Sequence, residues 1–336
     1  MRNKRLALAV ALPIAVAVGW MGYRAMTRNR TAAPLPAALP GGRLETDGVA
    51  GRLSCYATIP APDDRDHDPR PLLLLHSINA AGSAYEMRPL YEYYRKYRPV
   101  YAPDLPGFGM SERSDRRYGP RLMTDAVHAV VEQIQARHGA APIDAIALSL
   151  SCEFLARAAV ETPGSFRVLG LISPTGFDQR TPEGGPPGGT RGRPLLYQTL
   201  TVPPWRHGLF ELLSSRASIR YFLEKTWGSK NIDEGLLEYD YLTTHQPGAS
   251  FAPYRFVSGF LFSTDILNLY RRLAMPVWMV HGDRGDFVDY QKKTEIADRP
   301  NWHIEELPTG ALPHFEIPAR VIASYDAFSR AAVTAD

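Results

Sequence analysis

The stretch IDAIALSLSCEFLARAAVE, residues 143–161, decides the fold. Residues 143–149 form a short, largely apolar run, which is typical of a strand buried on both faces of a sheet. Residues 150–161 predict a helix that follows this strand with no linker between them. A buried strand that leads directly into a helix is the building unit of a parallel sheet covered by helices.

The segments on either side of this unit repeat the alternation of strand and helix. Further strands are expected at residues 51–60, 71–77, 98–104, 167–174, 275–282 and 301–308, and helices at 81–97, 117–139, 290–298 and 318–333. This order predicts an α/β fold with a mostly parallel sheet and helices on both faces.

Residues 175–272 interrupt the alternation, because they contain a Gly/Pro tract at 181–194 and aromatic-rich helical stretches without a convincing buried strand. We expect this helical insertion to lie across the carboxyl ends of the strands, where open α/β sheets bind ligands. Most of its aromatic side chains should pack a small core of their own, and some should line an apolar cavity.

A serine stands at the bend between the central strand and its helix. Ser149 is flanked two residues away by Ala147 and Ser151, so the sequence reads A-x-S-x-S. Small residues at these two positions allow the tight strand-to-helix turn that exposes a nucleophilic hydroxyl, and the helix aims its N-terminal amides at a developing oxyanion. The alternative interpretation is a serine that only caps the helix.

Residues 45–333 resemble the α/β-hydrolase superfamily, in the cap-bearing branch that includes esterases, dehalogenases, epoxide hydrolases and C–C bond hydrolases. Four segments besides the serine carry the resemblance. They are LLLLHSINAAGSAYEMRPL (72–90), VYAPDLPGFGMSER (100–113), PVWMVHGDRGDFV (276–288) and LPTGALPHFEIPARV (307–321), of which the second is the most specific.

The resemblance implies a catalytic serine, acid and histidine in that chain order, with two backbone amides as oxyanion donors. It assigns the nucleophile to Ser149 and the oxyanion donors to the amides of Ile78 and Leu150. It assigns the acid to Asp286, which comes one residue later than usual after the strand, and Asp283 is the alternative. Three further departures are the serine turn, where Ala147 and Ser151 replace the two glycines of the family's G-x-S-x-G, Ser77, where the family usually has glycine, and the histidine position.

The histidine position is a puzzle, because the family's catalytic histidine falls on Ala311 when the sequences are aligned on PHFEIP. His314 then occupies the place of a second, supporting histidine. Three residues along a helix correspond to roughly 4.5 Å, too far for an unchanged set of hydrogen bonds. We take His314 as the candidate base, and His207 and His245 in the insertion remain alternatives.

The composition excludes several classes of function. The net charge of +3 includes six basic and no acidic residues within 1–30, so the remainder carries 3 − 6 = −3, which argues against nucleic-acid binding. Only Cys55 and Cys152 are present, and neither their spacing nor any other cluster indicates a metal site. No glycine-rich phosphate loop precedes a helix, so we expect no nucleotide cofactor and no metal.

The N-terminus predicts a membrane element. Residues 6–23 carry no charge and, as a helix, would span roughly 27 Å, with basic residues on both sides. The sequence favours an uncleaved single-pass anchor over a signal peptide, and it leaves the orientation open. Residues 31–42 are expected to be an extended Pro/Ala linker.

These observations predict a membrane anchor or signal (1–30), a linker (31–42), a hydrolase core in two parts (43–174 and 273–336) and a helical cap (175–272). The expected function is a serine hydrolase that cleaves an ester or related acyl bond in a small lipophilic molecule, without a cofactor. Two alternatives stay open: a hydrolase-like protein that binds without turnover, and a lyase or acyltransferase on the same fold.

Overall fold

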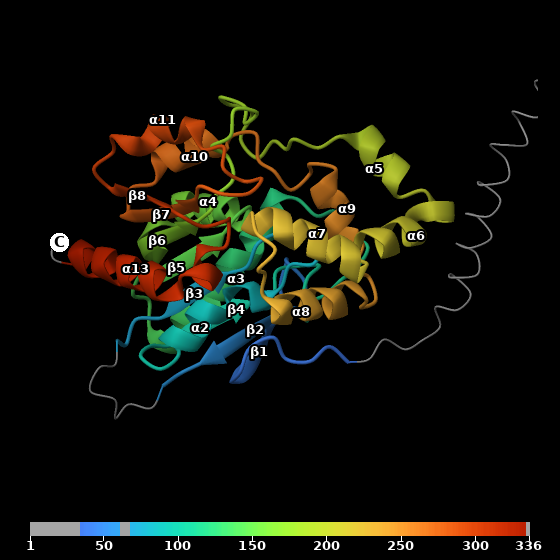
Figure 1. Cartoon of the computed structure of the whole chain (residues 1–336). Coiled ribbons are helices and arrows are strands. Elements are labelled where there is room, and N and C mark those ends of the chain that lie inside the picture. Colours follow the sequence, from blue (N-terminus) through green and yellow to red (C-terminus); the bar gives the residue numbers. More distant parts are fainter. Residues whose placement is uncertain (1–33, 61–67, 334–336) are drawn as a thin grey trace, which may run out of the picture.

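The computed structural model describes residues 34–60 and 68–333 and is built on one eight-stranded sheet (Figure 1). The strand order is β1-β2-β4-β3-β5-β6-β7-β8. The pairs β1–β2 and β2–β4 are antiparallel and all the others are parallel, which confirms the predicted fold class. The strands are β1 (Gly42–Thr46), β2 (Leu53–Thr58), β3 (Leu72–Leu75), β4 (Val100–Pro103), β5 (Ile143–Leu148), β6 (Phe166–Ile172), β7 (Val277–Gly282) and β8 (Trp302–Leu307).

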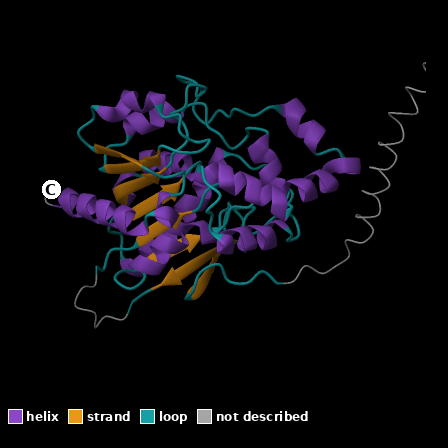
Figure 2. Cartoon of the chain, in the orientation of Figure 1, coloured by secondary structure: helices purple, strands orange, loops and turns teal. Residues whose placement is uncertain are grey.

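Helices cover both faces of the sheet, and the sheet lies between them in Figure 2. The helices of the core are η1 (Ala84–Met87), α2 (Arg88–Tyr94), α3 (Pro120–His138), α4 (Ser151–Glu161), η2 (Pro163–Ser165), η3 (Gln291–Lys293), α11 (Thr294–Ala297), α12 (Pro313–Glu316) and α13 (Pro318–Val333). Between β6 and β7 the chain forms α5 (Pro194–Leu200), α6 (Pro203–Leu213), α7 (Arg216–Trp227), α8 (Glu234–Thr244), α9 (Phe251–Val257) and α10 (Ile266–Arg272).

The apolar run of β3 shows why both faces need helices. Successive side chains of a strand point to opposite faces. Leu73 and Leu75 pack with α3 and α4, whereas Leu72 and Leu74 pack with α2 and α13. All four side chains are fully buried, so a continuous apolar run is what this central position requires.

The middle of the sheet positions the site. β5 lies between β3 and β6, and all three run parallel, with Ala147 opposite Leu75 and Leu148 opposite Ile172. Their carboxyl ends therefore meet at one edge, and so do the loops that follow them. Trp227, at the end of α7, is buried at the same side of the molecule, against Phe315 of α12.

The N-terminal region differs from expectation in two ways. The edge strand β1 was not predicted, because its side chains are mostly exposed and lack an apolar alternation. The predicted linker, 31–42, also contributes to the core: Ala38 and Leu39 are buried against β2, and the Ala38 amide donates to the Tyr56 hydroxyl at 3.0 Å.

The expected membrane anchor is not supported. Residues 6–23 lie outside the described residues, and within 34–60 and 68–333 no helix has the length and apolar character needed to cross a bilayer. The expectation of a single-pass anchor is therefore wrong for the structure as described.

Candidate active site

Ser149 lies at the sharp turn between β5 and α4, and its backbone is in the left-handed region with φ +55°. For a residue other than glycine this conformation costs roughly 1–3 kcal/mol, and it is typical of functional positions. The turn is fixed by the Ser149 amide, which donates to the Ile172 carbonyl at 2.8 Å. The Ser149 side chain is half-buried, and its hydroxyl makes no hydrogen bond to the described residues.

Ser151, which replaces the glycine usual at this turn, uses its hydroxyl to secure the site. Its Oγ donates to the carbonyl of His76 at 2.5 Å, in a fully buried environment. The bond ties the start of α4 to the end of β3. The departure from the usual glycine therefore adds a contact between the serine turn and the neighbouring loop.

Two backbone amides beside the serine have no acceptor among the described residues. They belong to Ile78, in the loop after β3, and to Leu150, the residue after Ser149. Both residues are buried, with 2% and 1% of their surfaces exposed. Buried amides are almost always paired, so two unpaired ones at neighbouring strand ends are the arrangement that an oxyanion site requires.

A buried carboxylate holds the loop that contains Ile78. Glu86 of η1 accepts from the Ser77 amide at 2.6 Å, from the Ser77 hydroxyl at 3.0 Å and from Asn79 Nδ2 at 2.6 Å. Only 3% of Glu86 is exposed. Ser77, the second departure from the usual glycine, is thus used twice to anchor this loop. Sequence analysis missed Glu86, since nothing local marks a glutamate of a first helical turn as a loop anchor.

A cap carboxyl lies near Glu86. Asp240 of α8 is buried, and its Oδ1 has no hydrogen-bond partner within the described ranges. Burial together with the charge of Glu86 raises the pKa of Asp240 well above the usual range. A neutral carboxyl is the form that this environment favours.

His314 is not directed at Ser149. Its Nε2 donates to the carbonyl of Glu86 at 2.7 Å, and its Nδ1 is buried with no hydrogen-bond partner among residues 34–60 and 68–333. Burial lowers the pKa of His314 to about 4, so the ring is neutral near pH 7. The expected hydrogen bond between this imidazole and the serine hydroxyl is therefore absent from the described arrangement.

The candidate acids are likewise directed elsewhere. Asp286 is exposed, and its Oδ1 lies 3.5 Å from Lys225 Nζ of α7. Asp283 is also exposed, and its backbone amide is hydrogen-bonded to the carbonyls of Leu307 and Thr309. Neither carboxylate is hydrogen-bonded to His314. The expected serine, histidine and acid are thus not joined in this structure.

The C-terminal end of α7 occupies the space between the acid loop and the histidine loop. The Lys225 carbonyl accepts from the Asp286 amide at 3.1 Å, and the Thr226 carbonyl accepts from the Ala311 amide at 2.9 Å. The last carbonyls of a helix lack partners within the helix, and here two loops supply them. A Cβ built on Gly310 would lie 2.5 Å from the Trp227 carbonyl oxygen, so the backbone of the histidine loop lies very close to the end of α7.

The other expectations have mixed outcomes. His245 is exposed, with its Nδ1 at 2.7 Å from the Tyr241 carbonyl oxygen, and His207 is exposed on α6. Within the described ranges no three His, Cys, Asp or Glu side chains are grouped to hold a metal ion. Phe210 and Tyr254 pack a small core inside the insertion, as expected.

The sequence model described as "Alpha/beta hydrolase family" matches residues 72–324, about three quarters of the chain. This chain belongs to the alpha/beta hydrolase family. No curated protein matches it.

Solved structures of other alpha/beta hydrolases share the architecture. A probable hydrolytic enzyme from Pseudomonas aeruginosa PAO1 is 17% identical, with a TM-score of 0.66 over 88% of this chain and 96% of that one. A meta-cleavage product hydrolase from Pseudomonas fluorescens IP01 is 15% identical, with a TM-score of 0.63 over 87% and 98%. A thermophilic esterase from Thermogutta terrifontis is 17% identical, with a TM-score of 0.61 over 87% and 99%. At these identities the likeness supports the fold alone.

Proposed function

We propose that this alpha/beta hydrolase cleaves an ester or related acyl bond in a small lipophilic molecule, with Ser149 as the nucleophile. One observation carries the proposal: Ser149 keeps a left-handed φ of +55° at the strand end where the Ile78 and Leu150 amides have no acceptor in the described part of the chain. A strained serine beside two free amides has no evident structural use, whereas both features serve acyl transfer.

In the proposed reaction the Ser149 oxygen attacks the acyl carbon, and the Ile78 and Leu150 amides stabilise the negative oxygen of the tetrahedral intermediate. The serine proton passes to the base and then to the leaving alcohol as the ester C–O bond breaks. Water subsequently attacks the acyl-serine, which releases the carboxylic acid and restores the serine hydroxyl.

His314 is the proposed base and Asp286 the residue that orients it. In this role the His314 ring carries its proton on Nδ1 instead of Nε2. Nε2 then leaves the Glu86 carbonyl and accepts from the Ser149 hydroxyl, and Nδ1 donates to Asp286, which leaves Lys225. Since the end of α7 bonds to the acid loop and to the histidine loop, withdrawal of α7 would release both together. The described arrangement is then the resting state.

A fluorophosphonate probe tests this proposal on the full-length chain. We expect covalent labelling of the wild-type protein at Ser149, and loss of labelling in Ser149→Ala and in His314→Gln. Folding of each variant is checked by circular dichroism. A folded wild-type protein that resists the probe contradicts the proposal.

A second candidate function is binding without turnover, and the hydrogen bond from His314 to the Glu86 carbonyl favours it. A serine without a base is a weak nucleophile near neutral pH. The variant Ala311→His separates the two functions, because it returns a histidine to the family's usual position. Labelling of Ala311→His but not of the wild-type protein would identify a binding site that lacks only its base.

A further inference from the structure

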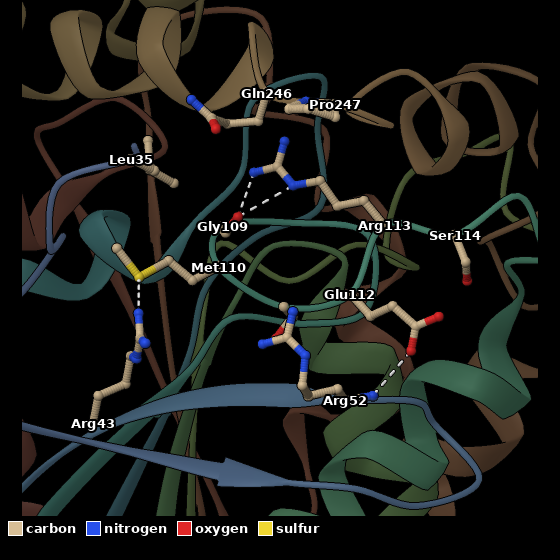
Figure 3. A pocket seen from close by; sticks show the side chains of 11 residues that line it. Leu35, Arg43, Arg52, Gly109, Met110, Glu112, Arg113, Ser114, Gln246 and Pro247 are labelled. Atoms are coloured by element: carbon tan, nitrogen blue, oxygen red, sulfur yellow. Dashed lines mark hydrogen bonds between the residues drawn. The ribbon is translucent and has the colours of Figure 1, made fainter. Parts of the chain in front are cut away.

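A cavity of about 550 Å³ lies away from Ser149, between the N-terminal strands, the loop after β4 and the end of α8 (Figure 3). Its wall includes Arg43 of β1, Arg52 just before β2, and Arg113. Figure 3 shows the three guanidinium groups around one space, with the Glu112 carboxylate at its edge.

The charges around this cavity do not cancel. Three guanidinium groups line it, and Glu112 supplies the single lining carboxylate. The neighbouring Glu45 interacts with Arg43 and Arg52, Asp104 with Arg113, and Arg116 with Glu112. Adding these three groups leaves 4 − 3 = +1. The Glu112 carboxylate already accepts one hydrogen bond, because its Oε2 lies 3.1 Å from the Arg52 backbone amide that donates to it.

Arg113 is the fixed element of the wall. Its guanidinium donates to the Gly109 carbonyl, to the Thr243 carbonyl at 2.6 Å and to the Thr243 hydroxyl at 2.7 Å. All these partners are neutral. Burial lowers the pKa of Arg113 to about 10, so the group still carries its charge near pH 7. The buried Asp104 carboxylate also attracts this charge and opposes the lowering of the pKa, so the positive potential that Arg113 contributes to the cavity is partly offset.

The guanidinium groups of Arg43 and Arg52 have N–H donors that are available to a ligand. Arg52 Nη1 lies 3.3 Å from Glu45 Oε1, and Arg43 Nη2 lies 3.6 Å from the same oxygen. The other described bond of the Arg43 side chain is to the Met110 sulfur, a weak acceptor. A guanidinium has five N–H donors that match a carboxylate or phosphate in a bidentate fork. Most of these donors therefore have no strong acceptor among the described residues.

Leu35, Met110 and Pro247 give the cavity an apolar side. We propose that this cavity binds the oxyanion, a carboxylate or a phosphate, of a small amphiphilic molecule between Arg43 and Arg52, with the apolar part against these three residues. The inference does not depend on the hydrolase proposal, because no residue of the cavity belongs to the Ser149 site.

Isothermal titration calorimetry of the full chain with octanoate, octyl phosphate, octanol and inorganic phosphate tests this proposal. We expect octanoate or octyl phosphate to bind and octanol to bind at least about tenfold more weakly. Added salt should lower the affinity for the anions. Octanoate alone would identify a carboxylate site, and octyl phosphate with inorganic phosphate a phosphate site.

Arg43→Gln and Arg52→Gln are each expected to weaken anion binding about tenfold. Arg52→Lys, which keeps the charge but loses the fork, should fall between. Arg220→Gln is the matched control, since Arg220 is a similarly exposed arginine paired with a single glutamate, Glu234, on the insertion. Unchanged affinity in the folded Arg43→Gln and Arg52→Gln variants, equal binding of octanol, or no binding at millimolar anion would each overturn the proposal.

Discussion

Glu86 shows how one side chain organises the site at the scale of single residues. Its carboxylate accepts from Ser77 and Asn79, and its carbonyl accepts from His314, so it joins the loop that contains Ile78 to the histidine loop. Neither link is visible in the sequence. The place of Ser149 at the turn between strand and helix could be predicted, because strand, serine and helix are adjacent along the chain. The direction of the His314 ring could not, because a backbone carbonyl far away in sequence decides it.

Replacing Glu86 by alanine should destabilise the protein and misplace the Ile78 amide. The Ser77 amide would lose its buried acceptor, at a cost of about 1–3 kcal/mol, whereas Asn79 Nδ2 would keep its bond to the Ser77 hydroxyl. We expect a lower unfolding free energy in urea, faster amide hydrogen exchange across residues 77–82, and slower fluorophosphonate labelling. Glu92→Ala is the control, since Glu92 is a partly exposed glutamate on α2. Unchanged amide hydrogen exchange in Glu86→Ala would show that the loop of residues 77–82 keeps its conformation without the Glu86 carboxylate.

The buried imidazole of His314 predicts acid sensitivity. Its pKa of about 4 in the fold lies below the ordinary 6.5, so the unfolded chain binds the proton more readily. Stability should therefore fall as pH decreases from 6.5 to 4, by at most about 3 kcal/mol from this group. His314→Gln cannot titrate and should lose less stability over this range in urea unfolding, whereas replacement of the exposed His303 should change little. Parallel pH curves for His314→Gln and wild type would contradict this assignment.

At the scale of elements, the apolar runs predicted β3, β5, β6 and β7 because these strands are buried on both faces. The edge strand β1 was missed because its exposed residues carry no such signal. The position of the end of α7 between the acid loop and the histidine loop could not be predicted from the sequence either. Its contacts join Lys225 and Thr226 to loops more than sixty residues later, and they use backbone groups that every residue type has.

We expect the conformation at the C-terminal end of α7 to require the glycine at position 228, because the φ of Gly228 is +59°. A Cβ at this position would lie 2.5 Å from the Gly285 nitrogen, so Gly228→Ala adds a backbone clash to the conformational strain. Gly188→Ala is the matched control, because Gly188 has a φ of +73° with nothing near its Cβ position. We expect Gly228→Ala to lose about 1–3 kcal/mol more than the control in urea unfolding.

The same variant tests whether α7 maintains the resting state. If the two loops are released together, Gly228→Ala should label faster with fluorophosphonate than Gly188→Ala. Slower labelling of Gly228→Ala in a folded protein would instead mean that α7 supports the reactive arrangement.

On the scale of the whole molecule, the helix that follows Ser149 also fastens both ends of the insertion. Glu153 of α4 accepts from the Thr175 hydroxyl and from the Ser263 amide, each at 2.7 Å. One turn later, Arg157 donates to Asp265 at 2.6 Å. The chain leaves the core near Thr175 and returns near Ser263, so these two turns of α4 tie the root of the insertion to the site.

Glu153 makes this junction sensitive to pH, because burial raises its pKa to about 7 although the two donors oppose the shift. The fold therefore prefers the protonated carboxyl, and stability from this group is lost as pH rises from about 4.5 through 7. Glu153→Gln can still accept from the Ser263 amide and donate to Thr175, and it should be more stable than wild type at pH 8 by at most about 3 kcal/mol, but not at pH 5. Glu161→Gln on the same helix should act oppositely, since hydrogen bonds from Arg121 and His128 outweigh burial and lower the Glu161 pKa. Equal pH dependence of urea unfolding in Glu153→Gln and wild type would show that protonation of Glu153 does not contribute to stability.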